Sequence, residues 1–135
     1  MRVLSADVRR LHLIRLDPGD DLLDGLTRVV REHGIRHAVF VSGVGSLSRY
    51  RVHVVQTTNL PPGDVFFEDD GPFDILALTG AVLDGRVHAH LTLSNTEKAM
   101  GGHLEPGCRV LTFAIAVLAE TSDADLGAWD RVGPL

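Results

Sequence analysis

One stretch of this sequence has the apolar spacing of an α-helix, whereas the other apolar runs have the lengths and spacing of β-strands. The helical stretch begins near Leu22, where apolar residues start to recur at intervals of three and four along one face. Asp20 or Gly19 is the predicted N-cap, and Gly34 suits the left-handed conformation that often ends a helix. A single helix among many strands restricts the chain to few fold classes.

The strand-like runs predict a sheet that packs against this helix. They cover residues 9–16, 37–42, 49–57, 73–83, 87–93 and 110–118, with a brief edge strand at 65–67. Asp84-Gly85 predicts a tight hairpin, whereas a bend is expected at 43–46, turns at 68–72 and 105–107, and a loop over 95–102. The predicted class is α+β (α/β), with a largely antiparallel or mixed β-sheet and one main packed helix.

The length of 135 residues is typical of a single domain with one core. No repeat or linker interrupts the pattern, so we expect one domain over residues 1–135, with a core at about 9–120 and a polar C-terminal tail over 121–135. Trp129 and Leu135 are the only residues of that tail that we expect to anchor it. The sequence therefore gives no sign of a second folding unit.

Cysteine content and hydropathy bear on the compartment and on metal chemistry. No window approaches the roughly 18 apolar residues of a membrane span, and no signal-peptide pattern opens the chain, so a cytoplasmic protein without membrane attachment is predicted. The single cysteine, Cys108, cannot form an internal disulfide and precedes an apolar run, which favours a buried structural thiol. Any metal must therefore be held by histidine or carboxylate side chains.

The charge distribution argues against a free-standing nucleic-acid binder. The formal net charge is -5, and the arginines are concentrated in the first 51 residues without forming a dense basic stripe. Diffuse arginines of this kind are more typical of solvated surface positions than of a phosphate-binding face. DNA binding consequently has weak support from composition.

Three histidines carry the most specific chemical pattern. His88 and His90 stand two apart on a predicted strand, so both side chains project from one face about 7 Å apart along the backbone. His103 follows two glycines, whose missing side chains allow a third imidazole to approach that face. Three neutral imidazoles suit Zn(II) and leave the open position typical of catalytic zinc, although histidines also occur on solvated strand faces without any metal. Glu97 and Glu105 are weak candidates for a catalytic general base, and surface solvation is the alternative for each.

Five sequence blocks together resemble the PPC (plant- and prokaryote-conserved) domain family. They lie at 18–23, 41–47, 73–80, 88–91 and 101–108, and the match runs in order over most of the chain. The resemblance implies a sheet with a packed helix, assembly as a homotrimer, and a DNA-binding label that is common among bacterial stand-alone members. In similar prokaryotic members His-x-His and Gly-Gly-His look like a zinc site, and these motifs fall here on His88, His90 and His103.

The resemblance leaves two functions open. Plant relatives carry AT-hooks that enter the minor groove, and this sequence contains no such hook, so the DNA-binding label transfers poorly. One hypothesis is a stand-alone PPC-domain protein with a regulatory or scaffold role, in which the metal steadies the site or the subunit junction and any DNA contact is indirect or made with a partner. The alternative is a small zinc-dependent hydrolase or lyase that uses metal-bound water, with Glu97 or Glu105 as proton acceptor.

Overall fold

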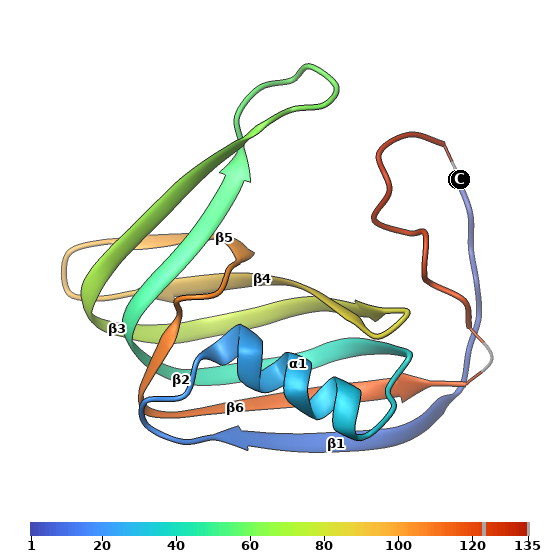
Figure 1. Ribbon diagram of the computed structural model, residues 1–135, viewed down its shortest axis with the longest axis horizontal. Helices are drawn as coiled ribbons and strands as arrows, with labels where there is room; N and C mark the ends of the chain where they lie inside the picture. The colour runs from blue at the N-terminus through green and yellow to red at the C-terminus, as the bar shows by residue number, and fades with distance from the viewer. Residues whose placement is uncertain (123, 135) are drawn as a thin grey trace.

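The structure is a computed structural model that describes residues 1–122 and 124–134 (Figure 1). The elements follow the order β1 (Val8–Leu16), α1 (Leu22–Glu32), β2 (His37–Val55), β3 (Asp64–Leu83), β4 (Arg86–Ser94), β5 (Ala99–Leu104) and β6 (Arg109–Thr121). Helix α1 lies across one face of the sheet, and the ends of β2 and β3 extend together as an arm away from the body (Figure 1).

The described strands form one sheet in the order β1-β6-β2-β3-β4-β5. Each of their pairings is antiparallel, which confirms the predicted antiparallel sheet with one packed helix. The mixed sheet and the α/β class are wrong, because every hydrogen-bonded strand pair that the structure describes is antiparallel. β1 and β2 run parallel to each other, but β6 lies between them and α1 makes the connection. The fold is mostly β with a single helix.

A second pairing of β2 closes part of the sheet on itself. The end of β2 pairs with β5 through Val52 opposite Leu104 and His53 opposite His103. Because β2–β3, β3–β4 and β4–β5 are also paired, these four strands form a closed ring. This closure brings together segments that are far apart in the sequence, and the candidate site lies on it.

Strands β2 and β3 are each longer than predicted, because interruptions expected from local sequence are absorbed by pairing. The bend at 43–46 lies within β2, and Gly45 has φ 147° where a Cβ would stand 2.2 Å from the Phe113 carbonyl oxygen. The turn expected at 68–72 is part of β3, where Arg49 bonds Asp70 at 2.8 Å across the strands. Cross-strand contacts here outweigh the turn preference of Gly-Pro and acidic residues.

The helix begins at Leu22, as expected, but Asp21 rather than Asp20 or Gly19 is its N-cap. The Asp21 carboxylate accepts a 3.0 Å hydrogen bond from the Asp24 N–H. The buried face of α1 lies against a continuous apolar core to which every described strand contributes. Its members include Leu47 on β2, Leu91 on β4, Leu104 on β5 and Leu118 on β6. The hairpin at Asp84-Gly85 is confirmed, since both residues have positive φ.

Two further expectations about the second half of the chain are wrong. The loop predicted at 95–102 contains the start of β5, which inserts between β4 and β2. The tail is not held by Trp129, which is 43% exposed, but by buried Ala124 and by the Asp130 side chain. Leu135, the other expected anchor, lies outside the described residues. Among the described residues, no helix combines the length and apolar character that crossing a bilayer requires.

Candidate metal centre

The three predicted histidines meet on one face of the β4–β5 hairpin. On β4, Ala89 is buried in the core, so His88 and His90 project from the opposite face, as period-two alternation dictates. His103 on β5 is the direct cross-strand partner of His90. One ligand atom from each of the three side chains lies within 4.8 Å of the other two.

The ring arrangement fits convergence on a common point rather than stacking of a solvated row. The His103 ring centroid lies 4.7 Å from that of His88 and 5.4 Å from that of His90, edge-on to both. The His88 and His90 rings are nearly parallel, with centroids 5.6 Å apart. Two parallel imidazoles and one perpendicular to them direct their nitrogens into a shared space.

The diglycine before His103 allows β5 to occupy its place between two strands. A Cβ on Gly101 would stand 2.6 Å from the Leu91 carbonyl oxygen, and one on Gly102 would stand 2.6 Å from the His53 carbonyl oxygen. Contacts this short would force the strands apart. Bare backbone at both positions therefore brings His103 within reach of β4 and β2 at the same time.

Burial and mutual repulsion favour the neutral form of two of these imidazoles, His90 and His103. Burial, followed by the neighbouring His88 and His53, lowers the pKa of His103 to about 4. Burial also lowers the pKa of His90, with smaller contributions from His88 and His53. Neutral imidazole is the form that donates a lone pair to a metal, so these side chains are suited to ligation at neutral pH.

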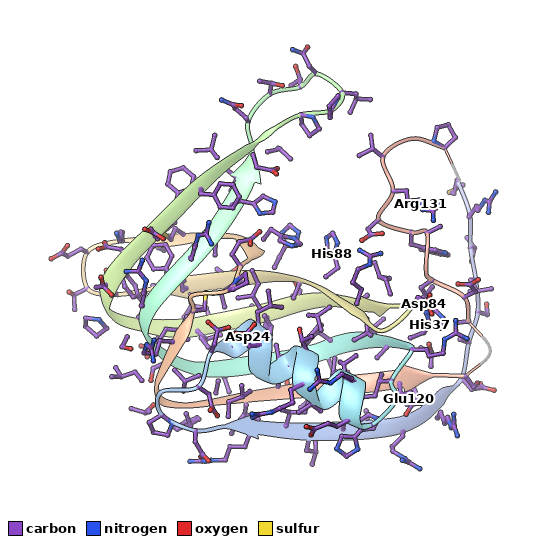
Figure 2. The ribbon with its side chains drawn as sticks, viewed as in Figure 1. Asp24, His37, Asp84, His88, Glu120 and Arg131 are labelled. Atoms are coloured by element: carbon purple, nitrogen blue, oxygen red, sulfur yellow. The ribbon has the colours of Figure 1, made fainter. Side chains whose placement is uncertain are left out.

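Asp130 supports His88 from the C-terminal tail. The His88 Nδ1 lies 3.2 Å from Asp130 Oδ2, and Arg86 donates to both carboxylate oxygens at 2.7 and 3.1 Å. His88 stands on the side of the sheet toward which the tail turns (Figure 2). A neutral His88 that donates its Nδ1 proton to this carboxylate has its lone pair on Nε2, which is then free to bind a cation. Sequence reasoning missed Asp130, because Trp129 and Leu135 were the anchors expected for this tail and Asp130 is 42 residues away from His88.

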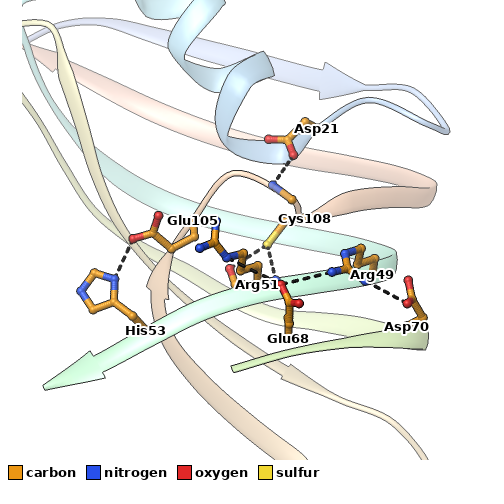
Figure 3. A network of polar contacts seen from close by, with 9 residues as sticks. Asp21, Arg49, Arg51, His53, Glu68, Asp70, Glu105 and Cys108 are labelled. Atoms are coloured by element: carbon orange, nitrogen blue, oxygen red, sulfur yellow. Dashed lines mark hydrogen bonds and ion pairs between the residues drawn. The ribbon is translucent and has the colours of Figure 1, made fainter. Parts of the chain in front are cut away.

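A fourth histidine, His53 on β2, also lies at the cluster. It is the cross-strand partner of His103, and the two ring centroids are 4.5 Å apart. Its Nδ1 lies 2.7 Å from Glu105 Oε1 (Figure 3). Neither the β2–β5 pairing nor this contact has a local sequence signal, so His53 was not among the predicted site residues.

The structure separates the two glutamates proposed as proton acceptors. Glu105 is half-buried directly beyond β5 and shares a group of close ligand atoms with His53 and His103. Glu97 is exposed in the β4–β5 turn, which precedes the first residue of β5, Ala99. Ala99 lies four strand residues, or about 13 Å, from His103, so Glu97 belongs to the far end of the hairpin. The geometry retains Glu105 as a candidate and removes Glu97.

The turn that carries Glu105 is tied to the helix and to β2. Asp21 accepts a 2.6 Å hydrogen bond from the Gly107 N–H in addition to capping α1 (Figure 3). The Cys108 thiol donates to the Arg51 carbonyl oxygen at 3.2 Å, and burial raises its pKa to about 11. Cys108 is therefore a structural thiol, as expected, and it helps to hold Glu105 beside β2.

These features define a mostly antiparallel β domain with one packed helix and a histidine cluster open to solvent on one face. The Plants and Prokaryotes Conserved (PCC) domain model matches residues 4–122, so the chain belongs to this family, for which the name PPC is also used.

Known proteins resemble the chain both in sequence and in structure. A bifunctional GlmU protein of a Synechococcus species is 35% identical over 115 residues, covering 84% of this chain; the chain spans about 17% of that relative's length. A metal-containing protein of Archaeoglobus fulgidus has a TM-score of 0.79 at 28% identity, covering 92% of this chain and 89% of its own. A PPC protein of Pyrococcus horikoshii has a TM-score of 0.78 at 25% identity, covering 93% and 87% respectively.

Proposed function

We propose that this chain is a metal-binding PCC domain with a regulatory role, in which His88, His90 and His103 hold one divalent cation, with zinc as the best fit. The observation that carries the proposal is the convergence of three ligand atoms within 4.8 Å of one another. Three nitrogen donors match the preference of zinc and leave a coordination position for water or another ligand. The likeness to a metal-containing protein of Archaeoglobus fulgidus supports the same conclusion.

The donor chemistry fits the proposed cation beyond the count of ligands. The pKa of both His90 and His103 is lowered, so a cation does not need to displace a proton from either ring at neutral pH. Asp130 supplies the outer carboxylate that orients His88. Histidine ligands of zinc commonly have such a carboxylate or carbonyl partner.

Metal analysis of protein purified without a histidine tag tests this proposal. We expect about one zinc per chain in the wild type and a large loss in His88→Ala and in His103→Ala, because each variant removes one of three ligands. His33→Ala is the matched control, since His33 is exposed at the end of α1. Equal zinc content in all four proteins would show that the cluster is not the site.

We expect the domain to assemble as a homotrimer through the outer face of β1, β2 and β6. Leu13, Val41 and Ile115 on these strands are exposed apolar side chains, at 78%, 60% and 39% exposure. A contiguous apolar face of this kind is typical of a protein interface. Sedimentation equilibrium should give a trimer for the wild type and a smaller species for Ile115→Glu. Thr96→Glu in the β4–β5 turn is the control and should remain a trimer. A monomeric wild type would contradict the expectation.

Hydrolysis is a second candidate function, favoured by the position of Glu105. A zinc ion bound at the cluster would lower the pKa of a bound water toward about 7. Glu105 is held by His53 Nδ1 at 2.7 Å next to His103, where a carboxylate can accept a proton. Esters, phosphoesters and lactones should be tested with and without chelator. Activity lost in Glu105→Gln but retained in Glu97→Gln would support an enzyme, whereas activity that survives chelation would refute the zinc mechanism.

Direct DNA binding by this chain has little electrostatic support. Five of the nine arginines in the first 51 residues lie beside carboxylates, among them Arg36 beside Asp84 and Arg49 beside Asp70. Phosphates would have to compete with these pairs. A gel-shift at about 50 mM salt that fades steeply by about 200 mM would show that phosphate contacts are nevertheless made.

A cytoplasmic location stays a prediction, supported by the single cysteine.

A further inference from the structure

A second group of ligand atoms adjoins the first and uses side chains that the three-histidine site does not need. His53, His103 and Glu105 also place one ligand atom each within 4.8 Å of the others. The His53 and Glu105 side chains are 19% and 21% exposed, so both are partly withdrawn from water yet reachable. The two groups share His103 and no other residue.

We propose that His53, His103 and Glu105 form a second position for a divalent cation, which overlaps with the first at His103 and is the one of the two positions that a harder cation such as Mn²⁺ occupies, whereas Zn²⁺ occupies the three-histidine position. The first group has three neutral nitrogen donors. The second replaces one of them with a carboxylate, and oxygen donors suit harder cations, so its selectivity differs.

The surroundings of His53 match those expected for a ligating histidine. If Nδ1 ligates together with the neighbouring Glu105 oxygen, the proton of the neutral ring is on Nε2. That nitrogen faces Asp64 Oδ1 at 3.5 Å. Asp64 would then orient His53 as Asp130 orients His88, with the roles of the two ring nitrogens exchanged. Each cation position thus has its own outer carboxylate, contributed by a different segment of the chain.

Occupation of the two positions is mutually exclusive. A neutral imidazole has one lone pair available for coordination, so His103 can serve one cation at a time. The domain therefore binds one cation per chain, and the metal that is present decides whether the cation sits toward β4 or toward β2. The inference depends on the proposed function only through His103, because the other two ligands belong to the second group alone.

Separate Zn²⁺ and Mn²⁺ titrations of metal-free full-length protein test the inference, by calorimetry for both and by electron paramagnetic resonance for Mn²⁺. We expect His53→Ala to weaken Mn²⁺ binding by about tenfold or more while changing Zn²⁺ affinity by no more than about twofold. His88→Ala should show the reverse pattern, and His103→Ala should weaken both. The wild type should bind one cation per chain, and a Mn²⁺ signal should decline as Zn²⁺ is added.

Glu105→Gln keeps the volume of the side chain and an oxygen that can accept from His53, so it tests the carboxylate without removing packing. It should weaken Mn²⁺ by about tenfold or more, whereas Glu97→Gln in the exposed turn should not. Circular dichroism of each variant checks that the fold is retained.

The outcomes separate the two proposals. Unchanged Mn²⁺ affinity in both His53→Ala and Glu105→Gln would overturn the second position and leave the three-histidine site intact. Loss of both metals in His88→Ala would do the same. Simultaneous binding of two cations per chain would overturn the mutual exclusion. A wild-type protein that binds neither cation would remove the proposed function as well.

Discussion

The attachment of the C-terminal tail through Asp130 leads to a quantitative prediction. Arg86 donates two hydrogen bonds to the Asp130 carboxylate, and His88 Nδ1 lies 3.2 Å from it. These contacts lower the pKa of Asp130 from 3.8 to about 2. The hydrogen bond from Arg86 contributes most to this change, and the hydrogen bond with His88 contributes less. Asp130→Asn keeps the size of the side chain and removes its charge, so it tests this attachment directly.

The pKa change sets the scale of the effect. A carboxyl whose pKa falls from 3.8 to about 2 on docking contributes about 2.4 kcal/mol at neutral pH. Arg86 is largely exposed, and solvent screening reduces this to about 1–2 kcal/mol. The substitution should therefore shift the docking equilibrium of the tail about 5- to 30-fold toward the detached state. Because the pKa is lowered, this stabilisation is present above pH 3.8 and is lost as the pH falls toward 2.

Trp129, the only tryptophan and the neighbour of Asp130, reports on the tail. In metal-free protein at pH 7, Asp130→Asn should shift Trp129 fluorescence toward that of a solvated indole and speed amide hydrogen exchange in the tail. Wild type should show the same change between about pH 4 and pH 2. Zinc affinity should fall about tenfold, since His88 loses its orienting partner.

Asp125→Asn is the control for this prediction, because Asp125 lies on the same tail and its side chain is 90% exposed. It should leave fluorescence, exchange and zinc affinity close to wild type. If Asp130→Asn behaved like this control at pH 7, the carboxylate would not hold the tail, and the argument from the Arg86 contact would be refuted.

Three further predictions concern stability and reactivity. Gly80→Ala should lower the free energy of unfolding in urea by about 2–6 kcal/mol, because the new Cβ would stand 2.1 Å from the His88 carbonyl oxygen at a backbone φ of 133°. Gly34→Ala is the control: its φ is 62° and the space around it is open, so it should cost only about 1–2 kcal/mol. Equal losses in the two variants would contradict the steric argument. Asp21→Ala should cost about 1–3 kcal/mol, since the cap of α1 and the Gly107 hydrogen bond are both lost; an unchanged urea midpoint would count against it. Cys108 should react with a disulfide reagent at pH 8 only as fast as the domain opens, because burial raises the pKa of its thiol to about 11, and rapid labelling of the native protein would disprove this.

Local patterns were sufficient for those parts of the fold and site in which neighbours in sequence are neighbours in space. The single helix, the Asp84-Gly85 hairpin and the shared face of His88 and His90 all follow from backbone periodicity and turn preference. Local patterns failed at 68–72 and 99–102, where residues expected in a turn or a loop lie within paired strands. Pairing with a distant strand satisfies the same backbone groups that a turn would otherwise leave to solvent.

The sequence by itself determined the family, one helix on an antiparallel sheet, and three histidines suited to a cation. Only the tertiary structure decided which further residues join them. His53 joins the cluster because β2 closes onto β5, and Asp130 reaches it because the tail turns back to the start of β4. Both depend on strand register and chain path over long sequence separations, and these are set by the packing of the whole core rather than by the preferences of nearby residues.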